Sequence, residues 1–182
     1  YTLSLHDALP ILIEIRYNGD PVLREFFEKI GDIHKNDTSL SDLYKKSKDT
    51  REWWENNVGA KWAYIEDFEL DESWCRIVLV SAWSPLDHFV KFIDEQTYHQ
   101  CRITFQYIDE MPNFAGYYII ENGDQVKELD IPDMWELIDE EKEIRLKAES
   151  PVFTEDYEER DWLWDWMWDF VYDTVDPENN NA

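Results

Sequence analysis

The order in which hydrophobic periodicity switches along this chain constrains its fold more than any other feature. Two stretches, residues 22–30 and 84–98, place apolar side chains at helical spacing. Five others have the alternation or short apolar runs of β-strands, at residues 11–17, 61–70, 74–83, 101–108 and 114–121. The first six elements therefore run strand, helix, strand, strand, helix, strand, which is the order of a split βαβ, ferredoxin-like unit. We predict an α+β fold whose antiparallel sheet carries its helices on one face.

Beyond the fifth strand, a meander and two helices are predicted to extend this unit. Asn122-Gly123 predicts a tight hairpin turn, followed by a short return strand through Leu129. The polar stretch 31–48 is predicted to be a loop with one helical turn. Helical patterns cover residues 133–147 and 155–173. The expected organisation has four parts: a leader at 1–10, a ferredoxin-like domain at 11–131, an acidic aromatic helical extension at 132–175 and a frayed tail at 176–182.

The first ten residues are set apart because they do not look like part of the domain. The opening YTLSLHDALPIL begins without Met and lacks the basic start of a secretory signal peptide. It resembles sequencing adapter translated at the edge of a metagenomic contig. We therefore expect residues 1–10 to be non-native, with the true start near Ile11 or upstream.

Charge is the most unusual feature of the composition. The 182 residues include 42 acidic and 17 basic side chains, a formal net charge of -25, yet 43% are hydrophobic and 16% aromatic. This apolar content is sufficient for a packed core, so a disordered acidic chain is not expected. A surface this negative repels nucleic acid and anionic membranes and favours a basic protein as partner.

Two further observations bear on where the protein resides. No apolar run approaches the roughly 20 residues of a membrane span, so we expect a soluble protein of the bacterial cytoplasm. Cys75 and Cys101 are the two cysteines. They are expected to be reduced core thiols in such a compartment, and a single disulfide between them is the alternative.

Few residues are arranged for catalysis or metal binding. The chain has no HExxH, G-x-S-x-G, P-loop or G-x-G-x-x-G pattern, and His88 and His99 flank the second helix without a recognisable nucleophile. Acidic clusters at residues 67–72 and 139–143 do not follow the EF-hand order, so only weak Ca²⁺ or Mg²⁺ binding is expected there. We predict no catalytic residue, no metal site and no cofactor.

The middle of the chain resembles a known family. Residues 51–62 (REWWENNVGAKW) look like the NWGTKW box of the YubB-type ferredoxin-like domains. Residues 81–85 (SAWSP) are similar to that family's TAWSPP box, and residues 105–123 (FQYIDEMPNFAGYYIIENG) resemble its Y-E-x-G-x-x-F-x-G-x-x-x-x-x-x-G tail. The boxes fall in the family's order and cover about residues 51–123. Val58 and Ala60 depart from the first box.

The resemblance implies a fold and a setting. It implies a ferredoxin-like domain in a small protein of a plasmid or phage, from a family that supplies no established activity and no catalytic residues. Leu86 departs from the second box, where the family has Pro. Physically, Ser84-Pro85 is expected to cap and start a helix, and Gly116 to permit close packing under Phe114. Three tryptophans are expected to anchor the core or its edge: Trp62, Trp74 and Trp83.

Half of the net charge lies in the last quarter of the chain. Residues 132–182 include 17 acidic and four basic side chains. Four aspartates there recur every four residues: Asp161, Asp165, Asp169 and Asp173. In a helix they form one slowly winding stripe with a spacing of about 6 Å along the axis. DNA phosphates recur on a broadly similar scale, so the stripe can occupy the Lys and Arg positions of a nucleic-acid channel.

Neighbouring side chains extend this candidate partner-binding surface. Glu158 precedes the stripe, and Trp164 and Trp168 can contact arginine through cation–π interactions. A second acidic patch is predicted at Glu140, Glu141 and Glu143. The plainer interpretation is an amphipathic helix whose aspartates only face solvent. Against it, residues 161–173 contain no lysine or neutral polar side chain, and their apolar arc is wider than one sheet face needs.

These observations support hypotheses from different functional classes. The first is an acidic nucleic-acid mimic from a phage or mobile element, which does not bind nucleic acid itself. It would inhibit a host CRISPR effector, for example Cas9, or a restriction enzyme by occupying its positive channel. The alternative is a non-enzymatic structural or adaptor protein that dimerises through the aromatic C-terminal helix. A small-molecule binder is the third, disfavoured for nucleotides by charge. Monomer and homodimer both stay open.

Overall fold

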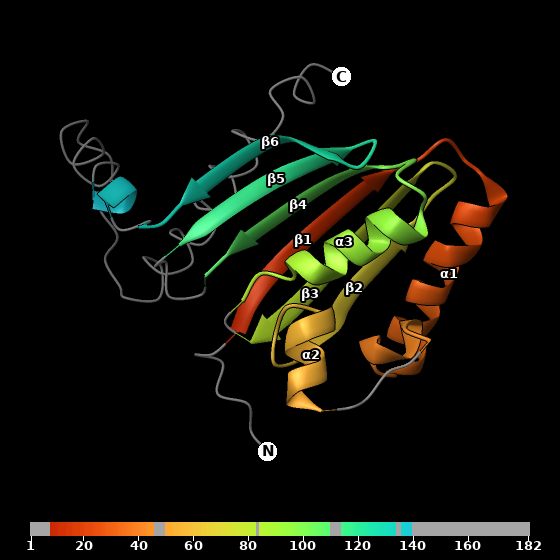
Figure 1. The fold of residues 1–182 in the computed structure, drawn as a ribbon, viewed down its shortest axis with the longest axis horizontal. Helices are drawn as coiled ribbons and strands as arrows, with labels where there is room; N and C mark the ends of the chain where they lie inside the picture. Colours follow the sequence, from red (N-terminus) through yellow and green to blue (C-terminus); the bar gives the residue numbers. More distant parts are fainter. Residues whose placement is uncertain (1–7, 46–49, 83, 110–113, 134–135, 140–182) are drawn as a thin grey trace, which may run out of the picture.

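The computed structural model of the protein describes residues 8–45, 50–82, 84–109, 114–133 and 136–139. Its strands form one antiparallel sheet in the order β2-β3-β1-β4-β5-β6 (Figure 1). They are β1 (Ala8–Arg16), β2 (Ala63–Leu70), β3 (Trp74–Ala82), β4 (Arg102–Ile108), β5 (Ala115–Glu121) and β6 (Asp124–Ile131). The helices include α1 (Pro21–Asn36), the 3-10 helix η2 (Leu40–Leu43), α2 (Arg51–Asn57) and α3 (Asp87–Gln96). The predicted α+β class with an antiparallel sheet is confirmed.

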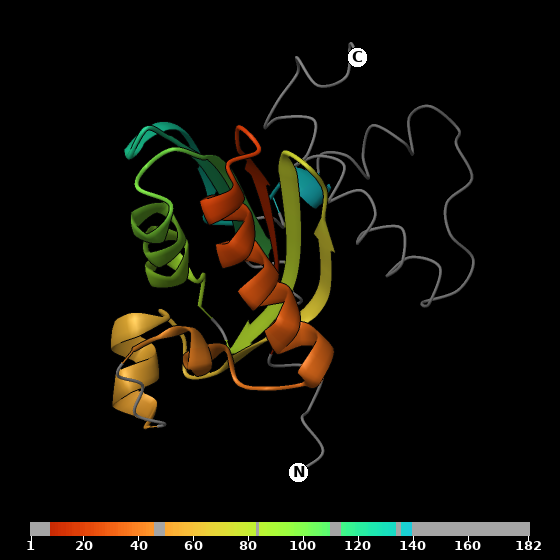
Figure 2. The same ribbon diagram turned by 90° about the vertical axis from the view of Figure 1, so that its right-hand side faces the viewer.

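Helices α1, α2 and α3 lie on one side of the sheet, which Figure 2 shows from the side. Helix α1 lies in the connection from β1 to β2, and β3 lies between these two strands in the sheet. Likewise, α3 lies in the connection from β3 to β4, and β1 lies between those two strands. This interleaving makes each neighbouring pair of these strands antiparallel. Between helices and sheet lies the core, which includes Phe27, Phe89 and Phe105, all wholly buried. No helix of the described residues is long and apolar enough to cross a membrane.

Strand β1 runs through the middle of the sheet, between β3 and β4. Every second side chain between residues 9 and 15 is wholly buried, as the alternation predicts. However, β1 begins at Ala8, and Leu9 pairs with Ser81 of β3. The strand therefore begins three residues earlier than predicted and takes in residues 8–10 of the expected leader. The sequence did not show this because the burial of Leu9 depends on a distant strand.

Helix α1 begins where the sequence predicts and ends later. The Asp20 side chain accepts a hydrogen bond from the backbone N–H of Val22 at 2.7 Å, and Pro21 occupies the first turn. The helix continues through Gly31 to Asn36, so the loop predicted at 31–48 is wrong at its start. A Cβ on Gly31 would stand 2.5 Å from the Phe68 ring of β2. This close approach of helix and sheet explains a glycine inside the helix.

Helix α3 begins two residues later than predicted. It starts at Asp87, and the preceding Leu86 makes no side-chain capping bond. Ser84 instead holds the turn from β3, since its carbonyl accepts a 2.8 Å hydrogen bond from the Ser81 hydroxyl. The role predicted for Ser84 and Pro85, to cap and start the helix, is therefore wrong.

Helix α2 has no counterpart among the predicted elements. Thr50 caps it, and Trp54 is buried beneath it. Nearby, the ring of Tyr44 stacks on Phe92 of α3 at 4.1 Å and meets Trp53 edge-on at 5.1 Å. Of the three predicted anchors, Trp62 and Trp74 are half-buried, and Trp83 lies outside the described residues.

The remaining predictions about the sheet are close to the structure. Asn122 and Gly123 both have positive φ, 54° and 84°, as a tight hairpin turn requires. Strand β6 runs two residues beyond the predicted end at Leu129. Cys75 and Cys101 are buried free thiols, as predicted, and burial raises the pKa of Cys75 to about 12.

Candidate functional site

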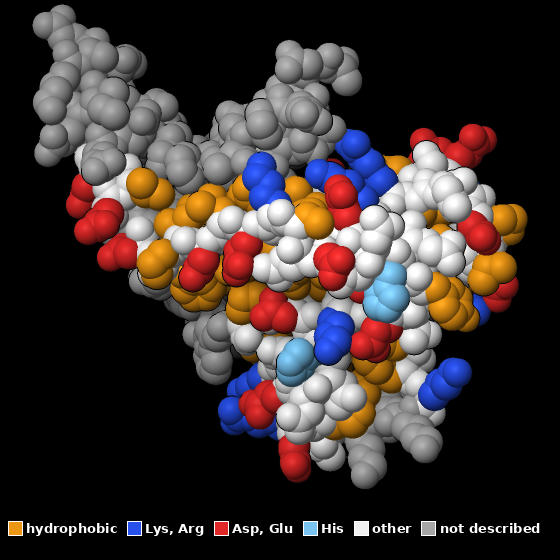
Figure 3. Space-filling view, turned by 45° about the horizontal axis from the view of Figure 1, so that its top comes forward, with side chains coloured by type: hydrophobic (Ala, Val, Ile, Leu, Met, Phe, Trp, Pro, Cys, Tyr) orange, Lys and Arg blue, Asp and Glu red, His pale blue; other side chains and the backbone are white. Residues whose placement is uncertain are grey.

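The described residues form a groove, here called the acidic groove, on the helix-covered face of the sheet. It lies between α3 and the outer strands β4, β5 and β6, and its volume is about 510 Å³. In Figure 1, α3 lies over the middle of the sheet, and β5 and β6 lie to one side of it. Acidic side chains are spread over this side of the molecule (Figure 3).

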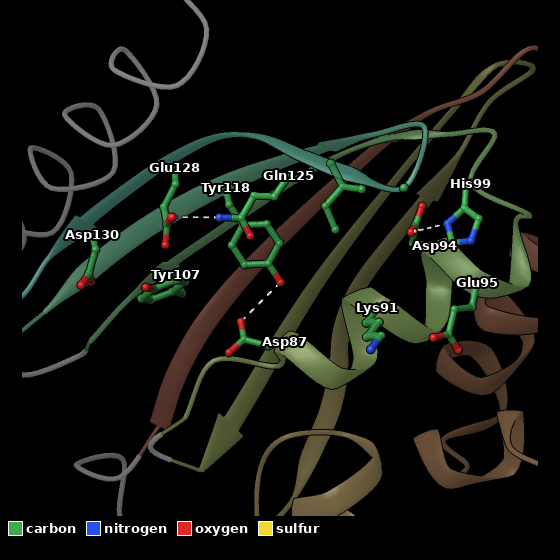
Figure 4. Close-up of a pocket in the computed structure, with 12 residues that line it drawn as sticks. Asp87, Lys91, Asp94, Glu95, His99, Tyr107, Tyr118, Gln125, Glu128 and Asp130 are labelled. Atoms are coloured by element: carbon green, nitrogen blue, oxygen red, sulfur yellow. Dashed lines mark hydrogen bonds and ion pairs between the residues drawn. The ribbon is translucent and has the colours of Figure 1, made fainter.

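Both walls of the acidic groove carry carboxylates. On α3, residues 87, 91, 94 and 95 follow helical spacing and line the groove, and only Lys91 among them is basic. On β6, alternate residues point into the groove. The five carboxylates are Asp87, Asp94 and Glu95 on α3 and Glu128 and Asp130 on β6 (Figure 4). Their common sign makes the groove attractive to cations.

Two tyrosines form its floor between the walls. The Tyr118 hydroxyl donates a 3.3 Å hydrogen bond to Asp87 Oδ1 (Figure 4). Burial raises the pKa of Tyr118, and the negative charge of Asp87 adds to this; burial likewise raises the pKa of Tyr107 to about 12. Asp87 keeps solvent contact, yet partial burial raises its pKa too, while the Tyr118 hydrogen bond opposes the rise. Both tyrosines are thus neutral donors at neutral pH.

Gly116 gives the Tyr107 side chain its space. A Cβ at this position would stand 2.5 Å from Tyr107 Oη and 2.8 Å from the backbone oxygen of Leu129. The close packing predicted at Gly116 is therefore made by Tyr107. Phe114 lies farther out, with its ring centroid 6.2 Å from that of Tyr107.

At the far end of the groove, His99 is held by a buried carboxylate. Its Nδ1–H donates to Asp94 Oδ2 at 2.6 Å. Only 6% of the Asp94 side chain is exposed, and its Oδ1 is buried without a hydrogen-bond partner. Such a buried oxygen costs free energy, which is offset in part by the short bond to His99. His99 is itself half-exposed, and the Gly123 turn of the hairpin lies against it.

This arrangement is suited to binding an amine or guanidinium group. The carboxylates supply charge, and the tyrosine rings supply apolar contact and neutral hydroxyl groups. Among the described residues, no three His, Cys, Asp or Glu side chains converge as a metal site. Of the cluster expected to bind metal weakly, Asp67 and Glu69 both face Arg76, at 3.3 and 3.5 Å.

All of the partner-binding residues predicted from the sequence lie outside the described residues. They are Glu140, Glu141, Glu143, Glu158, Asp161, Trp164, Asp165, Trp168, Asp169 and Asp173. Conversely, the sequence analysis did not identify the acidic groove. The polar face of α3 and the alternating acids of β6 were the available signals, but only the strand order reveals that they face each other.

Comparisons with known proteins give little beyond this geometry. No protein-family model matches the chain, and a search of curated proteins finds no match. Among solved structures, the crystal structure of a protein api92 from Yersinia pseudotuberculosis, assigned to the family DUF1281, is similar with a TM-score of 0.38 and 17% identity. The match covers 50% of this chain and 33% of that one. The resemblance to the YubB-type domains stays a prediction.

Proposed function

We propose that this protein is a non-enzymatic binding protein whose acidic surfaces occupy the basic, nucleic-acid-binding surface of a host protein. The observation that carries the proposal is the formal charge of -25, half of it in the last quarter of the chain. An excess of one sign destabilises a compact chain through self-repulsion. Binding a partner of opposite charge would relieve that self-repulsion.

The class of partner follows from charge and setting. Proteins that handle nucleic acid have positive channels, and the resemblance to plasmid and phage proteins favours host defence as the context. A CRISPR effector such as Cas9, or a restriction enzyme, is the expected partner in the bacterial cytoplasm. Binding would exclude the true ligand and would depend strongly on salt.

The acidic groove supports the same class of partner. Carboxylates on two walls and tyrosines between them suit a single lysine or arginine side chain inserted from a basic surface. In this account, the groove takes one cationic side chain while the aspartate stripe beginning at Asp161 lies along the partner's channel.

We also propose that β1 to β4, with α1 and α3, constitute a ferredoxin-like unit. The strand order β2-β3-β1-β4, the interleaved helical connections and the single helix-covered face support this assignment. Strands β5 and β6 are then an appended hairpin that builds one wall of the acidic groove.

Charge reversal tests the proposed function. The first variant changes four aspartates of the stripe to lysine: Asp161, Asp165, Asp169 and Asp173. A second, Glu128→Lys with Asp130→Lys, reverses the β6 wall of the groove. Its matched control, Asp32→Lys with Asp42→Lys, makes the same charge change at exposed positions of α1 and η2.

Affinity is measured for purified Cas9–guide complex and for a restriction enzyme. We expect the stripe and wall variants to bind at least about tenfold more weakly, mainly through slower association, and the control to bind nearly as the parent does. Equal affinity of the stripe variant and the parent would sink the proposal. If neither target binds and sedimentation shows a dimer, the adaptor alternative takes its place.

A further inference from the structure

The carboxylates of the acidic groove are gathered at its two ends. Three of them act on the Tyr107 hydroxyl. Burial raises the pKa of Tyr107 to about 12, and their negative charges add to the rise: Asp130, Asp87 and Glu128. We call this the Asp87 end. Figure 4 shows Asp94 and Glu95 at the other end, here called the Asp94 end, and Lys91 between the two.

The Asp94 end holds a buried charge that its neighbours compensate only in part. Asp94 lines the groove, although only 6% of its side chain is exposed. Its Oδ2 accepts the 2.6 Å hydrogen bond from His99, whereas its Oδ1 is buried without a hydrogen-bond partner among the described residues. Burying a carboxylate in this way is costly, and a cation in the adjoining groove offsets that cost. Asp94 therefore points to a cationic ligand more specifically than an exposed acidic cluster does.

The distance between the two ends follows from the elements that carry them. Asp87 and Asp94 are seven residues apart on α3, which places them about 10 Å apart along the helix axis. The sheet gives a similar length. Gly116, which pairs with Tyr107, and Ile120, which lines the groove near the hairpin, are separated by about 13 Å along β5. Two cations bound at the two ends would thus be about 10–13 Å apart.

Between the ends, the strand side of the groove offers apolar surface. Tyr118 and Ile120 line it from the same face of β5, and a chain of methylene groups can pack against them. Lys91 stands on the helix side, one turn from Asp87 and from Glu95 (Figure 4). Among the described residues, no ion pair joins Lys91 to a carboxylate. Its charge disfavours a cation at this level, so cations are expected at the two ends.

These features select one class of ligand. Five carboxylates against one lysine repel anions and zwitterions and attract cations. A single metal ion is too compact to reach both ends. The groove volume of about 510 Å³ is in the range of small-molecule sites, which is about 300–1,000 Å³. A flexible chain with a protonated amine at each end satisfies all of these conditions.

We propose that the acidic groove binds a free aliphatic diamine in an extended conformation, with one ammonium group at the Asp87 end and the other at the Asp94 end. With bonds near 1.5 Å and angles near 110°, an extended chain advances about 1.25 Å per bond. About nine bonds between the two nitrogens then span about 11 Å, which matches the separation of the ends. The compound 1,8-diaminooctane has this length.

This binding goes beyond the proposed function, in which the groove takes one cationic side chain of a host protein. It needs no host partner, so its test uses the full-length protein alone. Failure of diamine binding would leave capture of a nucleic-acid effector untouched, and failure of that capture would leave diamine binding untouched.

Isothermal titration calorimetry with three amines at one salt concentration provides the test. The first is 1,8-diaminooctane. Putrescine has the same charge on a shorter chain, and n-octylamine has the same carbon chain with one charge. We expect 1,8-diaminooctane to bind at least about tenfold more tightly than either, because only it can place a charged hydrogen-bond donor at both ends. General attraction to a chain of charge -25 would not separate the two diamines, since their charges are equal.

One substitution at each end locates the site. Glu95→Gln removes a carboxylate from the Asp94 end, and Asp130→Asn removes one from the Asp87 end, both at exposed positions. Each should weaken binding of 1,8-diaminooctane by about tenfold and reduce its advantage over n-octylamine. The matched control, Asp32→Asn with Asp42→Asn, removes two exposed carboxylates outside the groove. It should change the affinity by no more than about twofold.

Any of three results would overturn the proposal. Equal affinity for 1,8-diaminooctane and putrescine, or no measurable binding of either, would show that chain length is not recognised. Equal affinity for 1,8-diaminooctane and n-octylamine would leave a site for a single cation. Affinity that is unchanged in both end variants, or lowered as much in the control, would place the binding outside the groove. Circular dichroism of each variant verifies that the fold is retained.

Discussion

Replacing Gly116 with alanine tests how closely the floor of the acidic groove is packed. The new Cβ would stand 2.5 Å from Tyr107 Oη, 2.7 Å from Tyr107 Cζ and 2.8 Å from the carbonyl oxygen of Leu129. Cβ atoms do not approach other heavy atoms this closely, so part of the structure must move. The Tyr107 ring can swing into the groove. The Leu129 carbonyl cannot follow, because it belongs to the β5–β6 ladder.

Two opposing effects set the size of the change in unfolding free energy. Overpacking of this kind costs about 1–3 kcal/mol. Replacing glycine with alanine also reduces the conformational freedom of the unfolded chain. Where the native backbone accepts alanine, this stabilises the folded protein by about 0.4–1 kcal/mol. Overpacking is the larger effect, so we expect a net loss of about 1–2 kcal/mol. For a chain of this length that lowers Tm by roughly 2–8 °C.

Thermal unfolding followed by circular dichroism measures this shift. The same substitution in a Tyr107→Ala background should cost less, because only the Leu129 contact remains. An unchanged or higher Tm for Gly116→Ala in the parent would show that Tyr107 does not occupy this space, and the described floor of the groove would be wrong.

Three further predictions follow from the same structure. Self-repulsion at a charge of -25 should make Tm rise by several degrees between about 10 mM and 500 mM NaCl, and a flat response would contradict it. Leu9→Ala should cost about 2–5 kcal/mol in denaturant unfolding, against less than about 0.5 kcal/mol for exposed Val22→Ala; equal effects would return residues 8–10 to the leader. Because the folded pKa of Tyr107 is raised to about 12, its contribution to stability is complete below pH 10 and is lost as pH approaches 12. Tyr107→Phe should therefore flatten the decline in Tm over that range, and an equally steep decline would refute the assignment.

The sequence was informative where local pattern decides structure. Alternation or short apolar runs located β1 to β5, and Asn122-Gly123 located the hairpin that leads to β6, because each signal is complete within a few residues. The end of α1 was misplaced because Gly31 belongs in the helix, where it lets the helix approach Phe68 closely. The start of β1 was misplaced because Leu9 belongs to the strand through its pairing with β3. These are tertiary contacts that no local pattern reveals.

The site was harder to predict for the same reason. Asp87 and Asp130 lie far apart in the sequence, and the strand order places them on facing walls of one groove. Asp130 lies beyond the predicted end of its strand at Leu129, and no local pattern shows that it faces α3. The predicted surface around Asp161 stays a prediction, because it lies outside the described residues.

Capture of a purified nucleic-acid effector tests the central claim most directly. Full-length tagged protein is mixed with Cas9–guide complex, and with a restriction enzyme in parallel, at low and at high salt. The account predicts capture of one of them at low salt, loss of that capture at high salt, and competition by target DNA. Absence of capture of either at low salt, or capture that neither salt nor DNA weakens, would contradict it.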